Sequence, residues 1–127
     1  MILLDTDVMV DVLRGHEPAL AWLKESGIQE VGLPGLVAME LLQGCQNLRQ
    51  QKALQKRIKG LGMFWASAQD CDRALADFSA FYLSHQLGIL DALIGETAIG
   101  LGADLATFNV KHYSVLGGLK LIQPYLR

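Results

Sequence analysis

The sequence contains few cysteines, which cross-link small secreted domains, and few prolines, which interrupt helices and strands. It contains two cysteines and three prolines among 127 residues. Cys45 and Cys71 lie far apart and form no CxxC pair, which excludes a disulfide framework and a zinc site. We therefore expect two buried, reduced thiols in a cytoplasmic protein.

Long hydrophobic runs are missing as well. No uninterrupted apolar stretch reaches the roughly 18 residues that a membrane-spanning helix needs, so we expect no membrane partner. No basic segment precedes the apolar run after Met1, so we expect no signal peptide.

Neither sign of charge is in large excess. The chain has 11 Lys and Arg against 13 Asp and Glu, a formal net charge of -2. A nucleic-acid site would therefore have to be a local basic patch. Hydrophobic residues make up 51% of the chain and charged residues 19%, which argues against disorder and favours one domain around one core, residues 1–127.

Short apolar runs alternate with helical patterns along the chain. This alternation predicts an α/β fold of three α/β/α layers with a central, mostly parallel sheet of four to five strands. We expect strands at 2–4, 31–33, 63–65, 105–107 and 119–122, and helices at 8–14, 18–26, 36–46, 48–59, 70–85 and 89–101. The active crevice of such a sheet lies outside the carboxyl ends of its strands.

Acidic residues stand where the first strand ends. Asp5 follows the strand directly, and Asp7 is expected to cap the next helix, where a cap contributes about 1 kcal/mol. Asp11 lies inside that helix, three residues before Arg14, and is interpreted as a solvated acid beside its ion partner. For Asp5, capping and metal binding both remain open.

Two further acids lie among apolar residues. Glu40, in LVAMELLQG, belongs either to the solvent face of a helix or to the strand-end crevice. Asp91, in LDALIGETA, is either a first-turn acid favoured by the helix dipole or a charge that must be paired, bound to a metal or neutral. With Asp5 they would form a like-charge cluster that needs a cation, and oxygen ligands favour Mg²⁺ or Mn²⁺ over zinc.

The segment LATFNVKHY offers further oxygen donors. Thr107 is expected to end a strand and Asn109 follows it, so both lie at the same sheet edge. Asp104 begins that strand and is discounted as a ligand because it lies at the opposite end. His112 is interpreted as a surface or phosphate-facing imidazole.

Four segments in this order resemble PIN-domain ribonucleases, especially the VapC toxins of toxin–antitoxin pairs: LLDTDVMVDVLRG, LVAMELLQG, LDALIGETA and LATFNVKHY. The resemblance covers essentially the whole chain. It implies a metal-dependent endoribonuclease with Asp5, Glu40 and Asp91 as its acidic centre. It also implies a homodimer, inhibition by a cognate antitoxin, and products with a 5′-phosphate and a 3′-hydroxyl.

The chain departs from this family where many members carry a fourth acid. Asn109 and His112 occupy that neighbourhood, so we expect one well-held ion and at most one weak one. The resulting hypothesis is that Asp5 and Asp91 hold Mg²⁺, or Mn²⁺, directly, and that Glu40 acts through water. Thr107 and Asn109 would position the attacking water or the scissile phosphate.

A basic stripe is the candidate RNA-binding surface. No acid lies between Glu40 and Asp70, and the helix at 48–59 places four cations on one face, opposite its apolar side. These cations either form a solvated helix face or contact the phosphates of RNA. In the second case, RNA binding would weaken with rising salt concentration. The candidate RNA-binding residues are Arg49, Lys52, Lys56, Lys59, Lys111 and His112.

Two other functions compete with this interpretation. A haloacid-dehalogenase-like phosphatase would use Asp5 as nucleophile and Asp7 as general acid. That class also needs a later Lys and a further acidic pair at another strand end, and no such pair appears near residue 104, while Glu40 and Asp91 would have no role. A PIN-like domain that binds RNA or a protein without cutting is the second alternative, because the fourth acid is absent.

Overall fold

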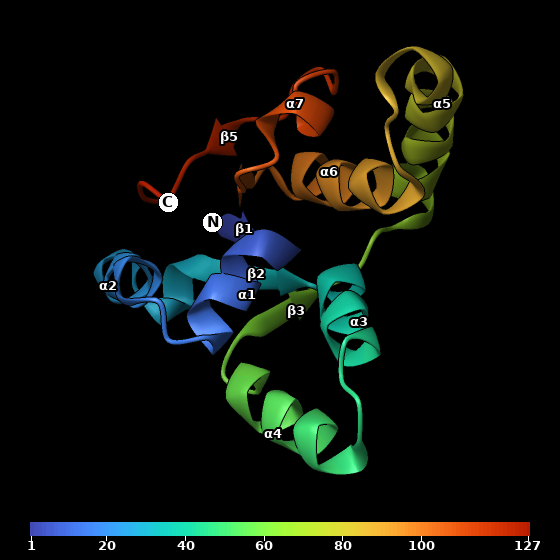
Figure 1. Ribbon diagram of the computed structural model, residues 1–127. Coiled ribbons are helices and arrows are strands. Elements are labelled where there is room, and N and C mark those ends of the chain that lie inside the picture. Colours follow the sequence, from blue (N-terminus) through green and yellow to red (C-terminus); the bar gives the residue numbers. More distant parts are fainter.

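Five short strands form one sheet in the computed structural model, which describes residues 1–127 (Figure 1). They are β1 (Ile2–Leu4), β2 (Val31–Pro34), β3 (Gly62–Phe64), β4 (Asp104–Ala106) and β5 (Leu121–Ile122). Their order is β3-β2-β1-β4-β5, and every neighbouring pair is parallel. The predicted α/β class and strand number are confirmed, and the sheet is parallel throughout.

Seven α-helices and one 3-10 turn connect the strands. The helices are α1 (Thr6–Leu13), α2 (Glu17–Ser26), α3 (Gly35–Gln43), α4 (Leu48–Ile58), α5 (Ala68–His85), α6 (Ile89–Leu101) and α7 (Val110–Tyr113), and the turn is Ile28–Glu30. The sequence did not predict α7, because four residues are too few to show a helical period. No helix has both the length and the apolar character that a bilayer crossing requires.

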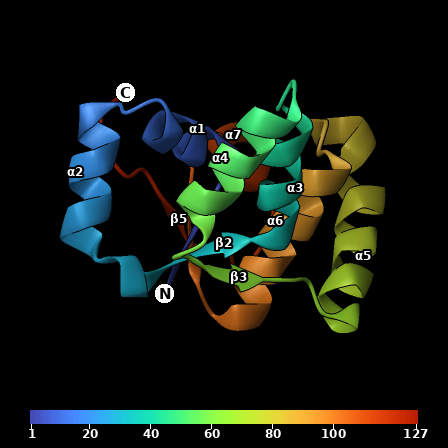
Figure 2. The same cartoon turned by 90° about the horizontal axis from the view of Figure 1, so that it is seen from below.

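The chain changes direction across the sheet after β3. It runs outward from β1 to β2 and β3, then returns to β4 on the other side of β1. Because parallel crossovers are right-handed, α1 to α4 cover one face and α5 to α7 the other. Figure 1 shows α4 below the strands and α6 above them, and in Figure 2, which is seen from below, α4 lies in front of α7. The carboxyl ends of β1 and β4 lie on either side of this reversal. In α/β proteins, ligand-binding and active sites lie at such a position.

The core lies where the central strands meet both helical layers. Leu3, Leu4, Leu33 and Leu105 are fully buried, as expected for strands covered on both faces. Burying each of these side chains contributes about 1.5–3 kcal/mol. The sheet edge that carries the candidate acids is therefore part of a rigid framework.

Two expectations about burial were wrong. The helical spacing of Leu36, Met39, Leu42 and Cys45 predicts that one apolar stripe of α3 is buried. In the structure Met39 is 55% exposed, while Val37 and Leu41 are buried. Nearly every residue of α3 is apolar, so the sequence pattern fits more than one face of the helix. The two cysteines are free but not buried, since Cys45 is half-buried and Cys71 is exposed.

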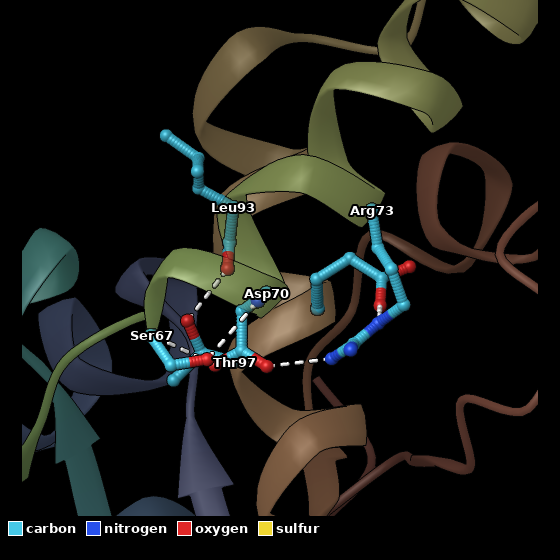
Figure 3. A network of polar contacts seen from close by, with 6 residues as sticks. Ser67, Asp70, Arg73, Leu93 and Thr97 are labelled. Atoms are coloured by element: carbon cyan, nitrogen blue, oxygen red, sulfur yellow. Dashed lines mark hydrogen bonds and ion pairs between the residues drawn. The ribbon is translucent and has the colours of Figure 1, made fainter.

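A polar network joins the start of α5 to α6 (Figure 3). Ser67 and Asp70 form a capping box, in which each side chain accepts from the other's backbone amide. Arg73 forms ion pairs with Asp70 and with Glu96, the latter at 2.7 Å. Burial and the neighbouring Glu96 carboxylate raise the pKa of Asp77 to about 7. We call Asp70, Arg73, Asp77 and Glu96 the interhelical cluster.

Candidate active site

Asp5 both ends β1 and begins α1. Its amide donates to the carbonyl of Ala106 at 3.0 Å, continuing the sheet ladder, and its extended backbone makes it the N-cap of α1. Oδ1 accepts from the amide of Thr6 at 2.8 Å, and Oδ2 accepts from the hydroxyl of Thr107 at 2.7 Å. Asp5 is only 7% exposed. The prediction that Asp7 caps this helix was wrong, because the helix begins at Thr6, one residue earlier.

Asp7 instead links the start of α1 to the loop after β4. Oδ1 accepts from the amide of Val8 at 2.7 Å, and Oδ2 accepts from the amide of Phe108 at 2.9 Å. The hydroxyl of Thr107 lies 3.3 Å from the same oxygen. Oδ2 of Asp7 therefore joins the two segments, whereas Oδ1 is engaged within α1.

Asp91 lies in the first turn of α6, where the helix dipole favours a carboxylate. A side chain at the preceding Gly88 would come within 3.2 Å of its Oδ2, so the helix start fits closely around the acid. The imidazole Nδ1 of His112 lies 3.6 Å from that oxygen and 3.2 Å from the amide nitrogen of Asn109. The segment after β4 therefore reaches Asp91 through His112.

Glu40, on α3, accepts a hydrogen bond from the hydroxyl of Thr6 at 2.9 Å. It lines three clefts, two of which lead to other candidate functional residues. One, of about 520 Å³, also contains Asp91 and the aromatic rings of Phe78 and Tyr82. The other, of about 1120 Å³, runs between α1, α3 and α4. Glu40 therefore belongs to the crevice and not to a purely solvated helix face.

Asp5, Asp7, Glu40 and Asp91, which we call the strand-end cluster, carry like charges without a lysine or arginine ion partner. Burial raises the pKa of Asp5 to about 6, the bond from Thr107 opposes this, and the charges of Asp7 and Asp91 add to the rise. The bonds from Thr6 and Thr107 orient Asp5 but do not cancel its charge. Such a gathering of like charges favours the binding of a cation.

The side-chain donors of the strand-end cluster determine which metal ion it could hold. No three carboxylate, imidazole or thiol side chains converge closely enough in the structure to enclose an ion by themselves. The donors are nevertheless carboxylate oxygens with spare lone pairs around a buried acid of raised pKa. Their chemistry fits a hard divalent cation that keeps several waters, as Mg²⁺ does.

The predicted basic stripe is only partly connected to these acids. Arg49, Lys52 and Lys56 are exposed on α4, and Lys59 is exposed just beyond it. Lys56 alone of the four lines the 1120 Å³ cleft that contains Glu40. Lys111, next to His112, is exposed on α7.

Three functional candidates in the structure had no signal in the sequence pattern. Arg57 lines the 1120 Å³ cleft and donates to the carbonyls of Val12 and Leu13, both at 3.4 Å. Phe108 supplies the amide that holds Asp7, and Tyr113 is buried beside Asp5 and Asp91. Each depends on contacts between distant segments. Only the shared basic character of α4 pointed towards Arg57.

Comparisons with known proteins found one matching family model and a relative of nearly the same length. The model of the PIN domain family matches residues 2–116. Ribonuclease VapC19 of Mycobacterium tuberculosis is 35% identical over 130 residues, which cover 98% of this chain and 100% of that protein.

Solved structures share the same fold. A toxin–antitoxin complex from Klebsiella pneumoniae superposes with a TM-score of 0.79 at 22% identity, covering 98% of both chains. VapBC2 from Rickettsia felis, bound to a DNA fragment from its promoter, superposes with a TM-score of 0.78 at 22% identity, covering 96% of this chain and 98% of that one. At these identities the structures support the fold alone.

Proposed function

The chain belongs to the PIN-domain family, and from that premise we propose that it is a VapC-like endoribonuclease, inhibited by a cognate antitoxin. The observation that carries the proposal is the strand-end cluster. It gathers acids from β1, α3 and α6 around a crevice and leaves their charge uncompensated. A relative that aligns along essentially the whole chain, VapC19, is named as a ribonuclease.

Asp5 and Asp91 are the residues that would hold Mg²⁺, or Mn²⁺, directly. Glu40 would act through water, since its Oε1 already accepts from Thr6. When bound, the ion polarises a phosphate oxygen and makes a water molecule nucleophilic. The absence of a fourth acid beside Asn109 supports one well-held ion rather than two.

The segment after β4 would orient the reacting groups. Thr107 fixes the direction of the Asp5 carboxylate with its hydroxyl and accepts from the amide of Asn109 at 3.0 Å. This leaves the Asn109 side chain beside His112, close to Asp91. Asn109 would position the attacking water or the scissile phosphate, and His112 would face the phosphate.

Cations along the 1120 Å³ cleft would bring RNA to this acidic centre. Arg14, Lys56 and Arg57 line the cleft that ends at Thr6 and Glu40. Phosphate contacts release counterions, so RNA binding should weaken steeply with salt. The exposed cations Arg49, Lys52, Lys59 and Lys111 would extend this path away from the centre.

Two protein partners belong to the proposal. The structural neighbours include toxin–antitoxin complexes, which supports a cognate antitoxin. A homodimer is supported by an apolar cleft of about 330 Å³ between α5 and α6, bordered by Leu75, Phe78 and Ile89. Leu75 is 69% exposed, and the neighbouring Tyr82 is 53% exposed, which is unusual for an apolar face without a partner.

The decisive experiment is cleavage of a structured RNA pool by purified protein. Mg²⁺ should be required, EDTA should abolish cleavage, and Asp5→Asn or Asp91→Asn should each reduce the rate about 10³-fold, as loss of several kcal/mol of charge stabilisation predicts. Lys24→Ala, on the exposed face of α2, is the matched control. Equal cleavage by the aspartate variants, or products with a 2′,3′-cyclic phosphate, would contradict the proposal.

A PIN domain that binds without cutting is the second candidate, because Asn109 and His112 stand where many family members carry a fourth acid. It predicts Mg²⁺ binding without RNA turnover in the same experiment. The phosphatase alternative is not favoured. Both oxygens of Asp7 accept from backbone amides, which leaves Asp7 poorly placed to act as a general acid.

A further inference from the structure

Tyr113 carries a buried polar atom that the fold does not use. The residue ends α7 and is 0% exposed, yet its phenol hydroxyl has no hydrogen-bond partner. Leaving a buried donor unpaired costs about 1–3 kcal/mol. A phenylalanine would fill nearly the same space without this cost, so the hydroxyl needs an explanation other than packing.

The hydroxyl belongs to the neighbourhood of the strand-end cluster. The ring of Tyr113 packs on α6, where a side chain at Gly95 would come within 3.6 Å of its Cδ1 atom. Asp91 lies one helical turn before Gly95 and therefore on the same face of α6. Burial, then the charges of Asp5 and Asp91, raise the pKa of Tyr113 far above its usual range. The phenol is therefore a protonated donor facing carboxylates.

Asp5 has acceptor capacity to spare. Its two oxygens receive one hydrogen bond from Thr6 and one from Thr107, whereas an ionised carboxylate offers about four lone-pair sites. Asp5 thus has an acceptor to spare, while the buried hydroxyl of Tyr113 has no partner.

We propose that Tyr113 is a positioning residue whose hydroxyl donates to the Asp5 carboxylate when a divalent cation occupies the strand-end cluster. This inference rests on the proposed function. Metal ligands are commonly oriented by such outer hydrogen bonds, and their loss costs roughly 10–100-fold in metal affinity or activity. Tyr113 would hold Asp5 from below, while Thr107 holds it from the side of β4.

The test compares Tyr113→Phe with Tyr125→Phe, which removes a hydroxyl outside the cluster that donates to Asp11 at 2.7 Å. Mn²⁺ affinity is measured by electron paramagnetic resonance, and the stability of the metal-free protein is measured by urea unfolding. Tyr113→Phe should weaken Mn²⁺ binding about tenfold and leave the metal-free stability unchanged or higher. Tyr125→Phe should lower the stability and leave Mn²⁺ affinity unchanged.

Three outcomes would overturn the inference. Unchanged Mn²⁺ affinity in Tyr113→Phe, with wild-type protein that binds Mn²⁺ and cuts RNA, would reject the role of Tyr113 and leave the proposed function intact. A loss of metal-free stability in Tyr113→Phe would show that the hydroxyl already serves the fold. Wild-type protein that neither binds Mn²⁺ nor cuts RNA would reject both proposals.

Discussion

The strand-end cluster and the interhelical cluster are built from the same acidic residue types but differ in their counter-charge. In the interhelical cluster, Arg73 reaches from α5 to Asp70 on its own helix and to Glu96 on α6. In the strand-end cluster, Asp5 receives only a hydroxyl and a backbone amide as donors. The first cluster has a cation supplied by the chain, and the second has none.

This difference separates a structural role from a functional one. Neutral donors orient a carboxylate but do not neutralise its charge. The carboxylates of the strand-end cluster therefore repel one another, which favours the binding of a cation. An arginine in the interhelical cluster satisfies two acids at once and joins two helices. Similar acids therefore join α5 to α6 in one region and form the proposed metal site in the other.

The largest expected change in stability and in RNA cleavage comes from removing one acid from the strand-end cluster. In the folded protein the pKa of Asp5 is raised from 3.8 to about 6. The protonated carboxyl therefore stabilises the fold at low pH, and this stabilisation is lost as the pH rises through that interval. Asp5→Asn, which retains a good N-cap, should therefore stabilise the metal-free protein at pH 8 by roughly 1–3 kcal/mol while reducing RNA cleavage about 10³-fold. Urea unfolding at pH 4 and pH 8 measures this, and equal midpoints for both proteins at pH 8 would contradict it.

Removing the cation from the interhelical cluster should have the opposite effect on stability. Arg73→Met leaves Asp70 and Glu96 buried without their partner, so we expect the urea midpoint of unfolding to fall. Arg49→Met, on the exposed face of α4, is the control and should change stability by less than about 0.5 kcal/mol. The comparison would fail if both variants unfolded at the same urea concentration.

Adding Mg²⁺ should stabilise only proteins with an intact strand-end cluster. At a free concentration of about 100 times Kd, a bound ion adds about 2.7 kcal/mol to the free energy of unfolding. Arg73→Met should retain this increment, whereas Asp91→Asn should lose it. Thermal unfolding with and without Mg²⁺ measures the increment, and an Mg²⁺ effect that survives in Asp91→Asn would place the ion elsewhere.

The smallest effect concerns Asp77 in the interhelical cluster. Its pKa is raised to about 7 by burial and by Glu96, so its protonated form is favoured in the fold and stability falls as the pH rises from about 4 through 7. Asp77→Asn should flatten this dependence, gaining stability at pH 8 and changing little at pH 4. Unfolding midpoints across this range measure it, and a slope as steep as that of the wild type would count against this account.

Some parts of the candidate site could be read from local sequence. An apolar run followed at once by Asp5 predicts an acid at a strand's carboxyl end, and the structure places it there. The run around Asp91 predicts a helix with the same bounds as α6, and Asp104 lies at the start of its strand as expected. Whether these acids hold a metal ion stays a prediction that the experiments above test.

Other interpretations failed because they relied on neighbours in sequence. Asp11 was expected to be solvated beside Arg14, but it is buried and accepts from Tyr125 at 2.7 Å and from Arg127 at 3.2 Å. These partners lie more than a hundred residues away. Helical spacing cannot predict such a contact, because it reports only residues three or four positions apart.

The sequence by itself determined the order of strands and helices, the parallel sheet and the position of Asp5 at the end of β1. These follow from the hydrophobic period and from the limited set of right-handed connections between parallel strands. Only the tertiary structure decided that Arg73 neutralises one group of acids, that Thr107 meets Asp5, and that the Tyr113 hydroxyl is buried near Asp5 and Asp91. The physical reason is that charge compensation depends on distances across the folded chain, whereas periodicity records only the local path of the backbone.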